Sequence, residues 1–163
     1  MTTLRARQLA AIAFLIGLAA ILGALASQYI GGLEPCELCY EQRLPYYWGL
    51  PLLGVALLLW PRAPQPVRTL ALALVAAIFA YGTWLGGYHA GVEWGWWPGP
   101  TSCTGVGEAI SFDALGDLNS ARVVPCDQVQ FRFLGLSLAG YNVLASAAVT
   151  ILVAAAAIID WRR

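Results

Sequence analysis

The stretch LAAIAFLIGLAAILGALASQYI, from Leu9 to Ile30, contains no charged residue over 22 positions. As an α-helix it is about 33 Å long, which exceeds the ~30 Å thickness of the hydrocarbon core of a bilayer. The whole chain has 163 residues, of which 60% are hydrophobic and only 11% are charged. A soluble domain of this size cannot bury so much apolar surface. The sequence therefore predicts an integral membrane protein.

Three further apolar stretches predict that the chain crosses the bilayer four times. Residues 67–88 and 134–159 are long enough to span, whereas residues 44–60 carry two prolines, so we expect a short and kinked helix there. Ala24-Leu-Ala26 resembles a signal-peptidase site, but the apolar run exceeds the usual ~7–15 residues, so we expect an uncleaved first helix. The predicted fold is all-α, a single four-transmembrane-helix domain over residues 1–163, with spans at 9–30, 44–60, 67–88 and 134–159 and outer loops at 31–43 and 89–133.

The charges predict how this bundle is oriented. If the spans alternate, the two ends of the chain and the loop between the second and third spans share one side and carry these arginines: Arg5, Arg7, Arg62, Arg68, Arg162 and Arg163. The positive-inside rule makes that side, and both termini, cytoplasmic. Most carboxylates and all four cysteines then face the outer compartment, which in bacteria is oxidising. With a net charge of zero and no basic cluster, the chain has no predicted nucleic-acid partner.

A Cys-x-x-Cys motif, Cys36 and Cys39, follows Pro35 just after the first span. Proline is favoured at the start of a helix, and a helix N-terminus lowers the pKa of a thiol. Arg43 lies four residues after Cys39, so on a helix the guanidinium gives that thiolate a permanent counter-charge. The loop between the two cysteines is too small to add much rigidity. We therefore predict a redox-active pair, with Arg43 as part of the same catalytic site.

The other two cysteines, Cys103 and Cys126, lie in one polar loop. A bond between them could staple that loop, contributing about 3 kcal/mol. Alternatively, the nearby prolines and glycines leave the pair exposed, and exposed disulfides in mobile loops exchange with other thiols. Residues 111–118 could add a short amphipathic turn against the bilayer. Zinc is disfavoured because His89 is the only histidine and four thiols in an oxidising compartment would oxidise first, so we expect no metal.

His89 is placed where the third span leaves the membrane. A single histidine at such a boundary is most often a hydrogen-bonded structural residue. Its position can also bring it close to Arg43 across the bundle, where its ring could bind the carbonyl group of a ligand. Ionisable groups near a membrane tend to be functional.

These motifs together resemble the DsbB family, the bacterial inner-membrane proteins that form disulfide bonds. The resemblance covers nearly the whole chain and rests on six segments: PCELC at 35–39, EQR at 41–43, YHAGVE at 88–93, WWPGPTSC at 96–103, PCD at 125–127 and FLGLSLAG at 133–140. It implies a protein-disulfide oxidoreductase of the inner membrane that reduces quinone, either ubiquinone or menaquinone. Its protein partner would be a periplasmic thioredoxin-fold oxidase like DsbA.

The resemblance also implies a reaction cycle for these residues. The reduced partner would attack the Cys103–Cys126 disulfide at Cys103, and the released Cys126 would then attack Cys36. Cys39, beside Arg43, would pass the electrons to a quinone that His89 helps to hold. Three alternatives stay open: a paralogous quinone-linked oxidase for a dedicated partner, an enzyme similar to vitamin K epoxide reductase, and a structural membrane protein with static disulfides.

Overall fold

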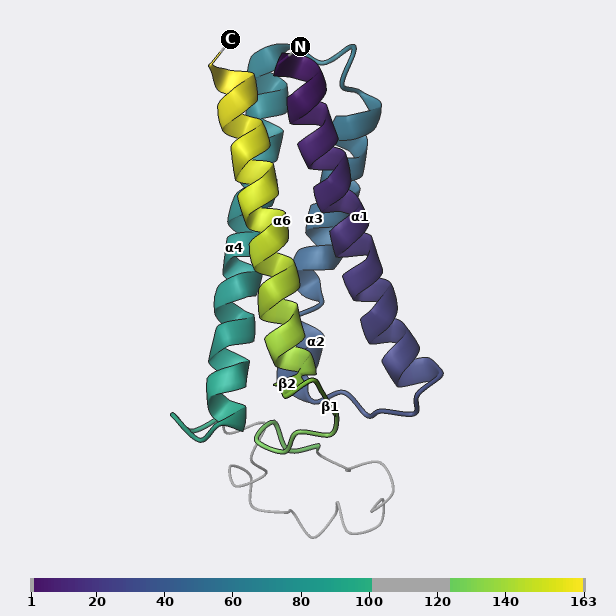
Figure 1. The fold of residues 1–163 in the computed structure, drawn as a ribbon, viewed down its shortest axis with the longest axis vertical. Coiled ribbons are helices and arrows are strands. Elements are labelled where there is room, and N and C mark those ends of the chain that lie inside the picture. Colours follow the sequence, from purple (N-terminus) through teal and green to yellow (C-terminus); the bar gives the residue numbers. More distant parts are fainter. Residues whose placement is uncertain (1, 101–123, 163) are drawn as a thin grey trace, which may run out of the picture.

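The computed structural model describes residues 2–100 and 124–162. Cys103 and the predicted turn at 111–118 therefore lie outside the described residues. Four helices run side by side, and the N- and C-termini lie at the same end of the molecule (Figure 1). They are α1 (Thr2–Tyr29), α3 (Leu44–Leu58), α4 (Gln65–Glu93) and α6 (Leu138–Trp161), with the short α2 (Glu37–Glu41) preceding α3.

The helical fold confirms the all-α expectation, and three of the helices are long and apolar enough to cross a membrane: α1, α4 and α6. The remaining long element, α3, has 15 residues and contains Pro51. At 1.5 Å per residue it is only about 22 Å long. The prediction that this segment is a fourth span is therefore not confirmed by its length.

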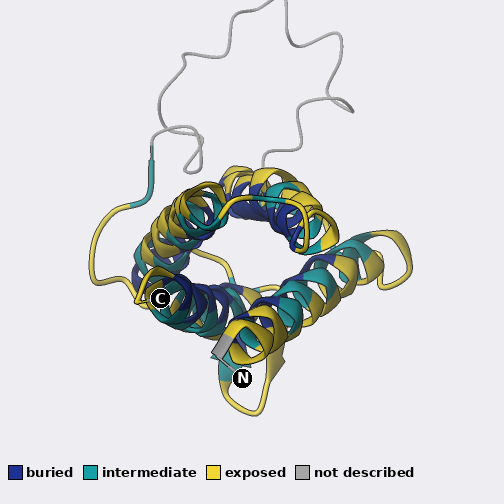
Figure 2. Cartoon of the chain, turned by 90° about the horizontal axis from the view of Figure 1, so that it is seen from above, coloured by how far each residue is buried: buried dark blue, intermediate teal, exposed yellow. Residues whose placement is uncertain are grey.

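Exposed residues lie on the outward-facing sides of the helices and buried residues on their inward-facing sides (Figure 2). Many of the exposed residues are large and apolar. Leu15, Trp48 and Ile151 are among the outward residues, each more than 60% exposed. Phe79 of α4 is fully buried, and its ring packs edge-on against that of Tyr46, with 5.1 Å between the ring centroids. An apolar exterior around a tightly packed interior is the pattern expected when lipid rather than water surrounds the helices.

Two glycines of α4 allow neighbouring helices to approach it closely near the end of the bundle that holds Cys36 and Cys39. A Cβ atom on Gly82 would lie 3.1 Å from the side chain of Pro45, and one on Gly86 would lie 3.0 Å from the Asn142 amide nitrogen. Small residues at such contacts let helix backbones pack closely in membranes. As a result, polar side chains of α3 and α6 come within hydrogen-bonding distance of one another at this level.

The last helix begins four residues later than the sequence predicted. Residues 132–137 form a hairpin of β1 (Arg132–Phe133) and β2 (Leu136–Ser137), in which Leu134 and Gly135 have φ angles of 49° and 83°. Positive φ at both central positions is the conformation of a tight two-residue hairpin turn. The helix then begins at Leu138, because the hydroxyl of Ser137 caps it by accepting from the Gly140 N–H at 3.2 Å.

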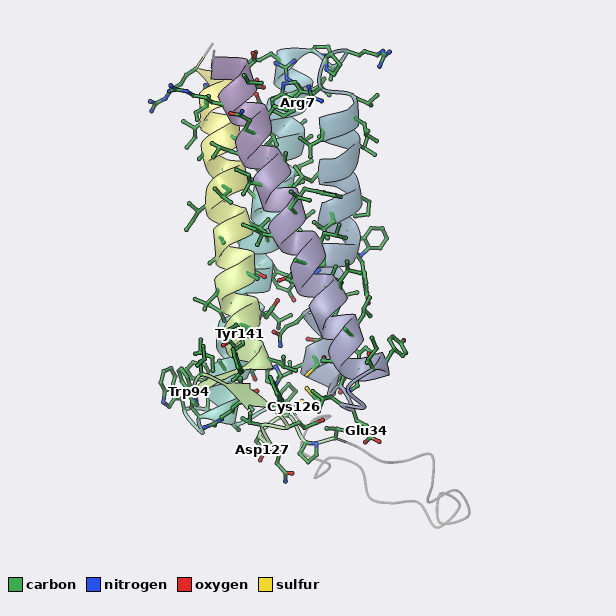
Figure 3. All side chains as sticks on the ribbon, turned by 45° about the vertical axis from the view of Figure 1, so that its right-hand side comes forward. Arg7, Glu34, Trp94, Cys126, Asp127 and Tyr141 are labelled. Atoms are coloured by element: carbon green, nitrogen blue, oxygen red, sulfur yellow. The ribbon has the colours of Figure 1, made fainter. Side chains whose placement is uncertain are left out.

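The two ends of the bundle carry different residues. Arg7 lies at the end that holds both termini, whereas Glu34, Cys126 and Asp127 lie at the opposite end (Figure 3). All the described cysteines are at this second end, which we call the sulfur end. The other end, with both termini, is called the terminal end below.

Candidate functional site

The sulfur end is built around the start of α2. Cys36 is the N-cap of this helix, and its sulfur accepts from the Cys39 N–H at 3.3 Å. Both cysteines are free, and their Sγ atoms lie 2.6 Å apart. Cys36 is buried, while Cys39 is half-buried. The motif is therefore a dithiol at a helix N-terminus, as the sequence predicted, with its sulfurs close enough to form a bond with little backbone movement.

The two thiols differ sharply in acidity. The hydrogen bond from Cys36 is the main cause that lowers the pKa of Cys39, although burial of Cys39 opposes it. The pKa of Cys36 is raised, first by its hydrogen bond to Cys39 and then by burial. Cys39 is consequently the more acidic thiol of the pair, and Cys36 is the proton donor in the hydrogen bond between them. Since the thiolate is the nucleophilic and electron-donating form, the chemistry toward an acceptor is concentrated on Cys39.

Arg43 lies directly behind this pair. Its side chain is only 7% exposed, its Nη1 donates to Gln28 Oε1 at 2.5 Å, and its guanidinium lies 5.2 Å from the centre of the Tyr40 ring. The Arg43 charge lowers the pKa of Cys39, but less than the hydrogen bond from Cys36 does. The counter-charge predicted from the sequence is thus present, although it is a minor cause of the acidity of Cys39.

His89 joins the two sulfur-containing segments. Its ring is buried, and its Nε2 lies 3.2 Å from the Cys126 carbonyl oxygen and 3.7 Å from Cys36 Sγ. Cys126 is disulfide-bonded and only 2% exposed. The expectation that this cysteine is exposed is therefore wrong. Cys126 is buried because it packs with Cys36 in a small apolar cluster, together with Leu38, Leu85 and Val92.

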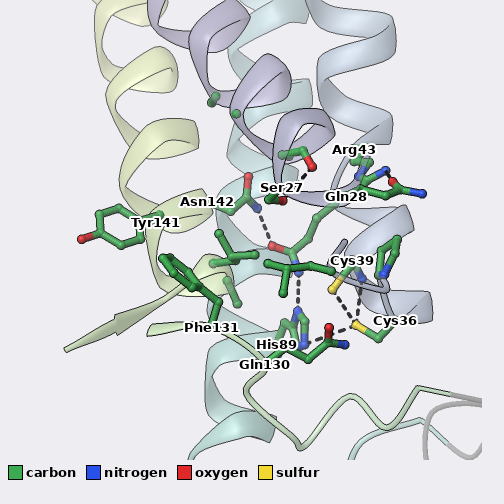
Figure 4. Close-up of a pocket in the computed structure, with 18 of the residues that line it drawn as sticks. Ser27, Gln28, Cys36, Cys39, Arg43, His89, Gln130, Phe131, Tyr141 and Asn142 are labelled. Atoms are coloured by element: carbon green, nitrogen blue, oxygen red, sulfur yellow. Dashed lines mark hydrogen bonds between the residues drawn. The ribbon is translucent and has the colours of Figure 1, made fainter. Parts of the chain in front are cut away.

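A cavity of about 580 Å³ opens beside these groups, between α1 and the start of α6 (Figure 4). Cys36, Cys39, Arg43 and His89 all line it. Most of the remaining wall is apolar, including these residues: Ile16, Ala20, Leu33, Phe131, Leu138 and Ala139. A mostly apolar cavity with a few convergent polar groups is the usual form of a small-molecule site.

Sequence reasoning missed a chain of polar side chains on the same wall. The Tyr46 hydroxyl donates to Asn142 Oδ1 at 2.7 Å, and Asn142 Nδ2 donates to Gln42 Oε1 at 2.7 Å. Gln42 Nε2 in turn lies 2.5 Å from His89 Nδ1. The available signal was the presence of amides such as Asn142 inside an otherwise apolar span, where unpaired polar groups are costly.

Cys36, Cys39 and His89 also form a group of possible metal ligands, with donor atoms that lie within 4.8 Å of one another. Two thiolates and an imidazole suit zinc, which would leave one coordination position open. Ligation by Nε2, the ring nitrogen near Cys36, requires a lone pair on that atom. The protonation state of His89 Nε2 therefore decides whether this group of residues can bind a metal.

Comparison with known protein families gives a match to the model of disulfide bond formation protein DsbB over residues 6–156. No curated protein and no solved structure gave a significant match. Because the family model covers most of the chain, the chain belongs to the DsbB family, which confirms the resemblance drawn from its motifs. Together with the three long apolar helices, membership makes this a multi-pass membrane protein and a disulfide oxidoreductase.

Proposed function

We propose that this DsbB-family protein takes an electron pair from a reduced thioredoxin-fold oxidase on the periplasmic face of the bacterial inner membrane and passes it to quinone. The observation that carries the proposal is the Cys36–Cys39 dithiol at the wall of an apolar cavity beside Arg43. A thiol with a lowered pKa that faces an apolar cavity is suited to a lipid-soluble electron acceptor and poorly suited to a water-soluble one.

The proposed topology has four spans, with α3 as the short second one, in a single domain over residues 1–163. The arginine-rich terminal end, which includes Arg7, lies in the cytoplasm, and loops 31–43 and 89–133 lie in the periplasm (Figure 3). Local thinning of the bilayer and interfacial side chains such as Trp48 can accommodate the short length of α3. This placement puts the sulfur end at the outer face.

The cavity fits the chemical character of a quinone, either ubiquinone or menaquinone. A quinone has a flat apolar ring whose two carbonyl oxygens accept hydrogen bonds, and it takes up two electrons and two protons when reduced. The apolar wall from α1 suits the ring, and Arg43, which also lines the cavity, is a donor for a carbonyl oxygen, while His89 lines the wall beside Cys36. Arg43 forms no salt bridge among the described residues, so its charge is available to a bound carbonyl group.

The exchange steps balance without any further reactant. The partner's dithiol reduces the Cys103–Cys126 disulfide, entering at Cys103, so that the partner leaves oxidised and Cys126 is released. The Cys126 thiolate then attacks Cys36 of the Cys36–Cys39 disulfide: one S–S bond forms, one breaks, and Cys39 leaves as a thiolate. Cys103 next attacks Cys126, which restores the Cys103–Cys126 disulfide and releases Cys36, and the Cys36–Cys39 dithiol returns to a disulfide by giving two electrons and two protons to quinone. The burial of Cys126 against Cys36 supports this role, since Cys126 is better placed to meet Cys36 than a soluble protein.

Cys39 is the residue that faces the acceptor in this scheme. Its lowered pKa makes it a better leaving group in exchange and favours the thiolate once it is released. Arg43 stabilises this anion at its own end of the cavity. Cys103, outside the described residues, is assigned its role through the family relationship alone.

The direct test is anaerobic mixing of the purified protein with a reduced DsbA-like oxidase and with ubiquinone or menaquinone. We expect one quinol per oxidised partner, measured by the loss of quinone absorbance and by thiol counting. A paralogous or vitamin K epoxide reductase-like enzyme would reduce quinone with a different thiol donor. A scaffold with static disulfides would consume neither substrate, and this result would overturn the proposal.

A further inference from the structure

We infer that Gln42 is a positioning residue that fixes His89 as the neutral tautomer protonated at Nε2, with this proton directed at the Cys126 carbonyl oxygen and the Cys36 sulfur. The inference deepens the proposed function and rests on it, because it assigns His89 a task in thiol exchange between the two sulfur-containing segments. The argument depends on which groups at each contact can only donate and which can only accept.

The orientation of the Gln42 amide is set by the backbone. The Gln42 side chain is buried, and its Nε2 lies 3.3 Å from the Leu38 carbonyl oxygen. A carbonyl oxygen only accepts, so the amide nitrogen rather than the amide oxygen must face it. The amide oxygen then faces Asn142 Nδ2 at 2.7 Å, which is a donor. Rotating the amide by 180° would place two acceptors against each other at Leu38.

The other end of the chain is consistent with this orientation. Asn142 turns its Nδ2 toward Gln42, so its Oδ1 must accept on the opposite side. There it receives the Tyr46 hydroxyl at 2.7 Å and the Ser146 hydroxyl at 3.4 Å. Hydroxyl groups can donate or accept, so they adapt to the direction that Leu38 sets. Each of these buried side chains has a partner, and the direction of the chain is consistent throughout.

This series of hydrogen-bonded side chains ends in an N–H group that points at His89. One amide hydrogen of Gln42 is used at Leu38, and the second points at His89 Nδ1, 2.5 Å away. Nδ1 must therefore accept and carry no proton, which excludes both the Nδ1–H tautomer and the imidazolium ion. In a neutral ring the remaining nitrogen, Nε2, carries the proton.

The surroundings of Nε2 support the same assignment independently. Its described neighbours are the Cys126 carbonyl oxygen at 3.2 Å, the Cys36 sulfur at 3.7 Å and a carboxylate oxygen of Glu93 at 4.0 Å. A carbonyl and a carboxylate only accept, and a sulfur can accept weakly. The proton on Nε2 therefore has acceptors on every described side.

This proton links the two partners of the internal exchange. By donating to the Cys126 carbonyl next to Cys36, the ring holds the segment of Cys126 where its sulfur can reach Cys36 Sγ. The Cys36–Cys126 bond forms as the Cys36–Cys39 bond breaks, and the leaving electrons stay on Cys39. A proton on Nε2 also removes the lone pair that a metal would need there, so the same tautomer disfavours zinc at Cys36, Cys39 and His89.

The test uses the fact that His89 is the only histidine of the chain. Protein grown with ring-¹⁵N histidine gives the signals of a single imidazole, and nitrogen chemical shifts distinguish a protonated from an unprotonated ring nitrogen. We expect a protonated Nε2 and an unprotonated Nδ1 in the wild type. In Gln42→Glu the carboxylate cannot donate, so Nδ1 should become protonated. In Gln42→Met, which keeps the length of the side chain, we expect a mixture of both tautomers.

Gln28→Met is the matched control, because Gln28 lines the same cavity but contacts Arg43 instead of His89. Its histidine spectrum should equal that of the wild type. A second measurement follows the Cys36–Cys126 bond by mass spectrometry in a Cys39→Ala background, where this bond forms when the Cys36 thiolate attacks Cys126 of the Cys103–Cys126 disulfide and Cys103 leaves as a thiolate. Gln42→Met should slow this step about tenfold. A wild-type ring protonated at Nδ1, or a spectrum unchanged in both Gln42 variants, would overturn the inference. Absence of quinone reduction in the wild type would instead overturn the proposed function and leave the tautomer assignment standing.

Discussion

Each end of the bundle holds an arginine beside an aromatic ring, but the two arginines have different partners for their charge. At the terminal end, Arg68 lies 5.4 Å from the Trp60 ring centre and forms a 3.0 Å ion pair with Asp160, which is fully buried. At the sulfur end, Arg43 lies 5.2 Å from the Tyr40 ring centre, and its hydrogen-bond partner among the described residues is a neutral amide oxygen, that of Gln28. One arginine is neutralised by a permanent partner, whereas the other carries a charge that, among the described residues, no carboxylate within 4.0 Å compensates.

This difference indicates a structural role for the terminal end and a functional role for the sulfur end. Asp160 also accepts from the Thr69 hydroxyl at 3.0 Å, so the terminal end joins α4 to α6 through a closed polar cluster. The sulfur end places its polar groups around a cavity of about 580 Å³. Buried charges without an ion-pair partner are costly, and inside a membrane they are kept for function. Substitutions at the terminal end should therefore reduce stability, and substitutions at the sulfur end should reduce activity.

The largest effect is expected for Cys39→Ala. The variant keeps the fold but has no second sulfur with which to complete a disulfide, so quinone reduction should fall to the rate of the uncatalysed reaction. The measurement is anaerobic turnover with the reduced partner, together with a thermal unfolding curve in detergent. A midpoint close to that of the wild type is part of the prediction. Turnover that survives in this variant would mean that the electrons leave by another route.

The opposite pattern is expected at the terminal end for Asp160→Ala. Removing the carboxylate leaves Arg68, whose side chain is only 13% exposed, without an anion, which should lower the free energy of unfolding by about 3 kcal/mol. The KM for quinone should not change. Reversible unfolding in mixed micelles measures the first quantity and steady-state kinetics the second. The double variant Arg68→Met/Asp160→Leu is the control, because replacing both charges by apolar side chains should restore most of the stability.

The sequence predicted much of the sulfur end, because local spacing determines its parts. Pro35 before Cys36 predicts a helix start, and a separation of four residues places Arg43 behind Cys39. Sequence spacing could not predict that Cys126 is buried against Cys36, since that contact depends on how a long loop returns to the bundle. The late start of α6 was missed for a different reason: the apolar run from Leu134 conceals the Ser137 cap.

The intermediate effect is expected for Arg43→Gln, which tests the uncompensated charge directly. Without the guanidinium, the cavity loses its cation, and the KM for quinone should rise about tenfold, equivalent to ~1.4 kcal/mol of lost binding. Arg43→Lys keeps the charge but not the planar fork and should recover only part of the affinity. Steady-state kinetics at several quinone concentrations measure the effect. An unchanged KM in Arg43→Gln would show that the two arginines have the same, purely structural role.

The smallest effect concerns pH, because protonation removes the charge of the Cys39 thiolate at the sulfur end. The pKa of Cys39 is lowered from its ordinary value near 9.0, mainly by the hydrogen bond from Cys36. The thiolate is therefore present above this lowered pKa and is lost as the pH falls through it. In protein whose Cys36–Cys39 pair has been reduced to the dithiol, Cys39 should react faster with iodoacetamide than Cys36 at neutral pH. Mass spectrometry of the two labelled positions across a pH series measures both rates.

The causes of the shift also predict the order of two variants. Cys36→Ala removes the strongest influence and should raise the pKa of Cys39 more than Arg43→Gln does, since the Arg43 charge contributes less. Asp160→Ala is the matched control and should leave the labelling profile unchanged, because the ion pair lies at the opposite end of the bundle. If Arg43→Gln raised the pKa of Cys39 more than Cys36→Ala, the arginine rather than the neighbouring thiol would set the acidity of the site. The uncompensated charge would then act on the sulfur itself, and binding of quinone would need another donor on the cavity wall.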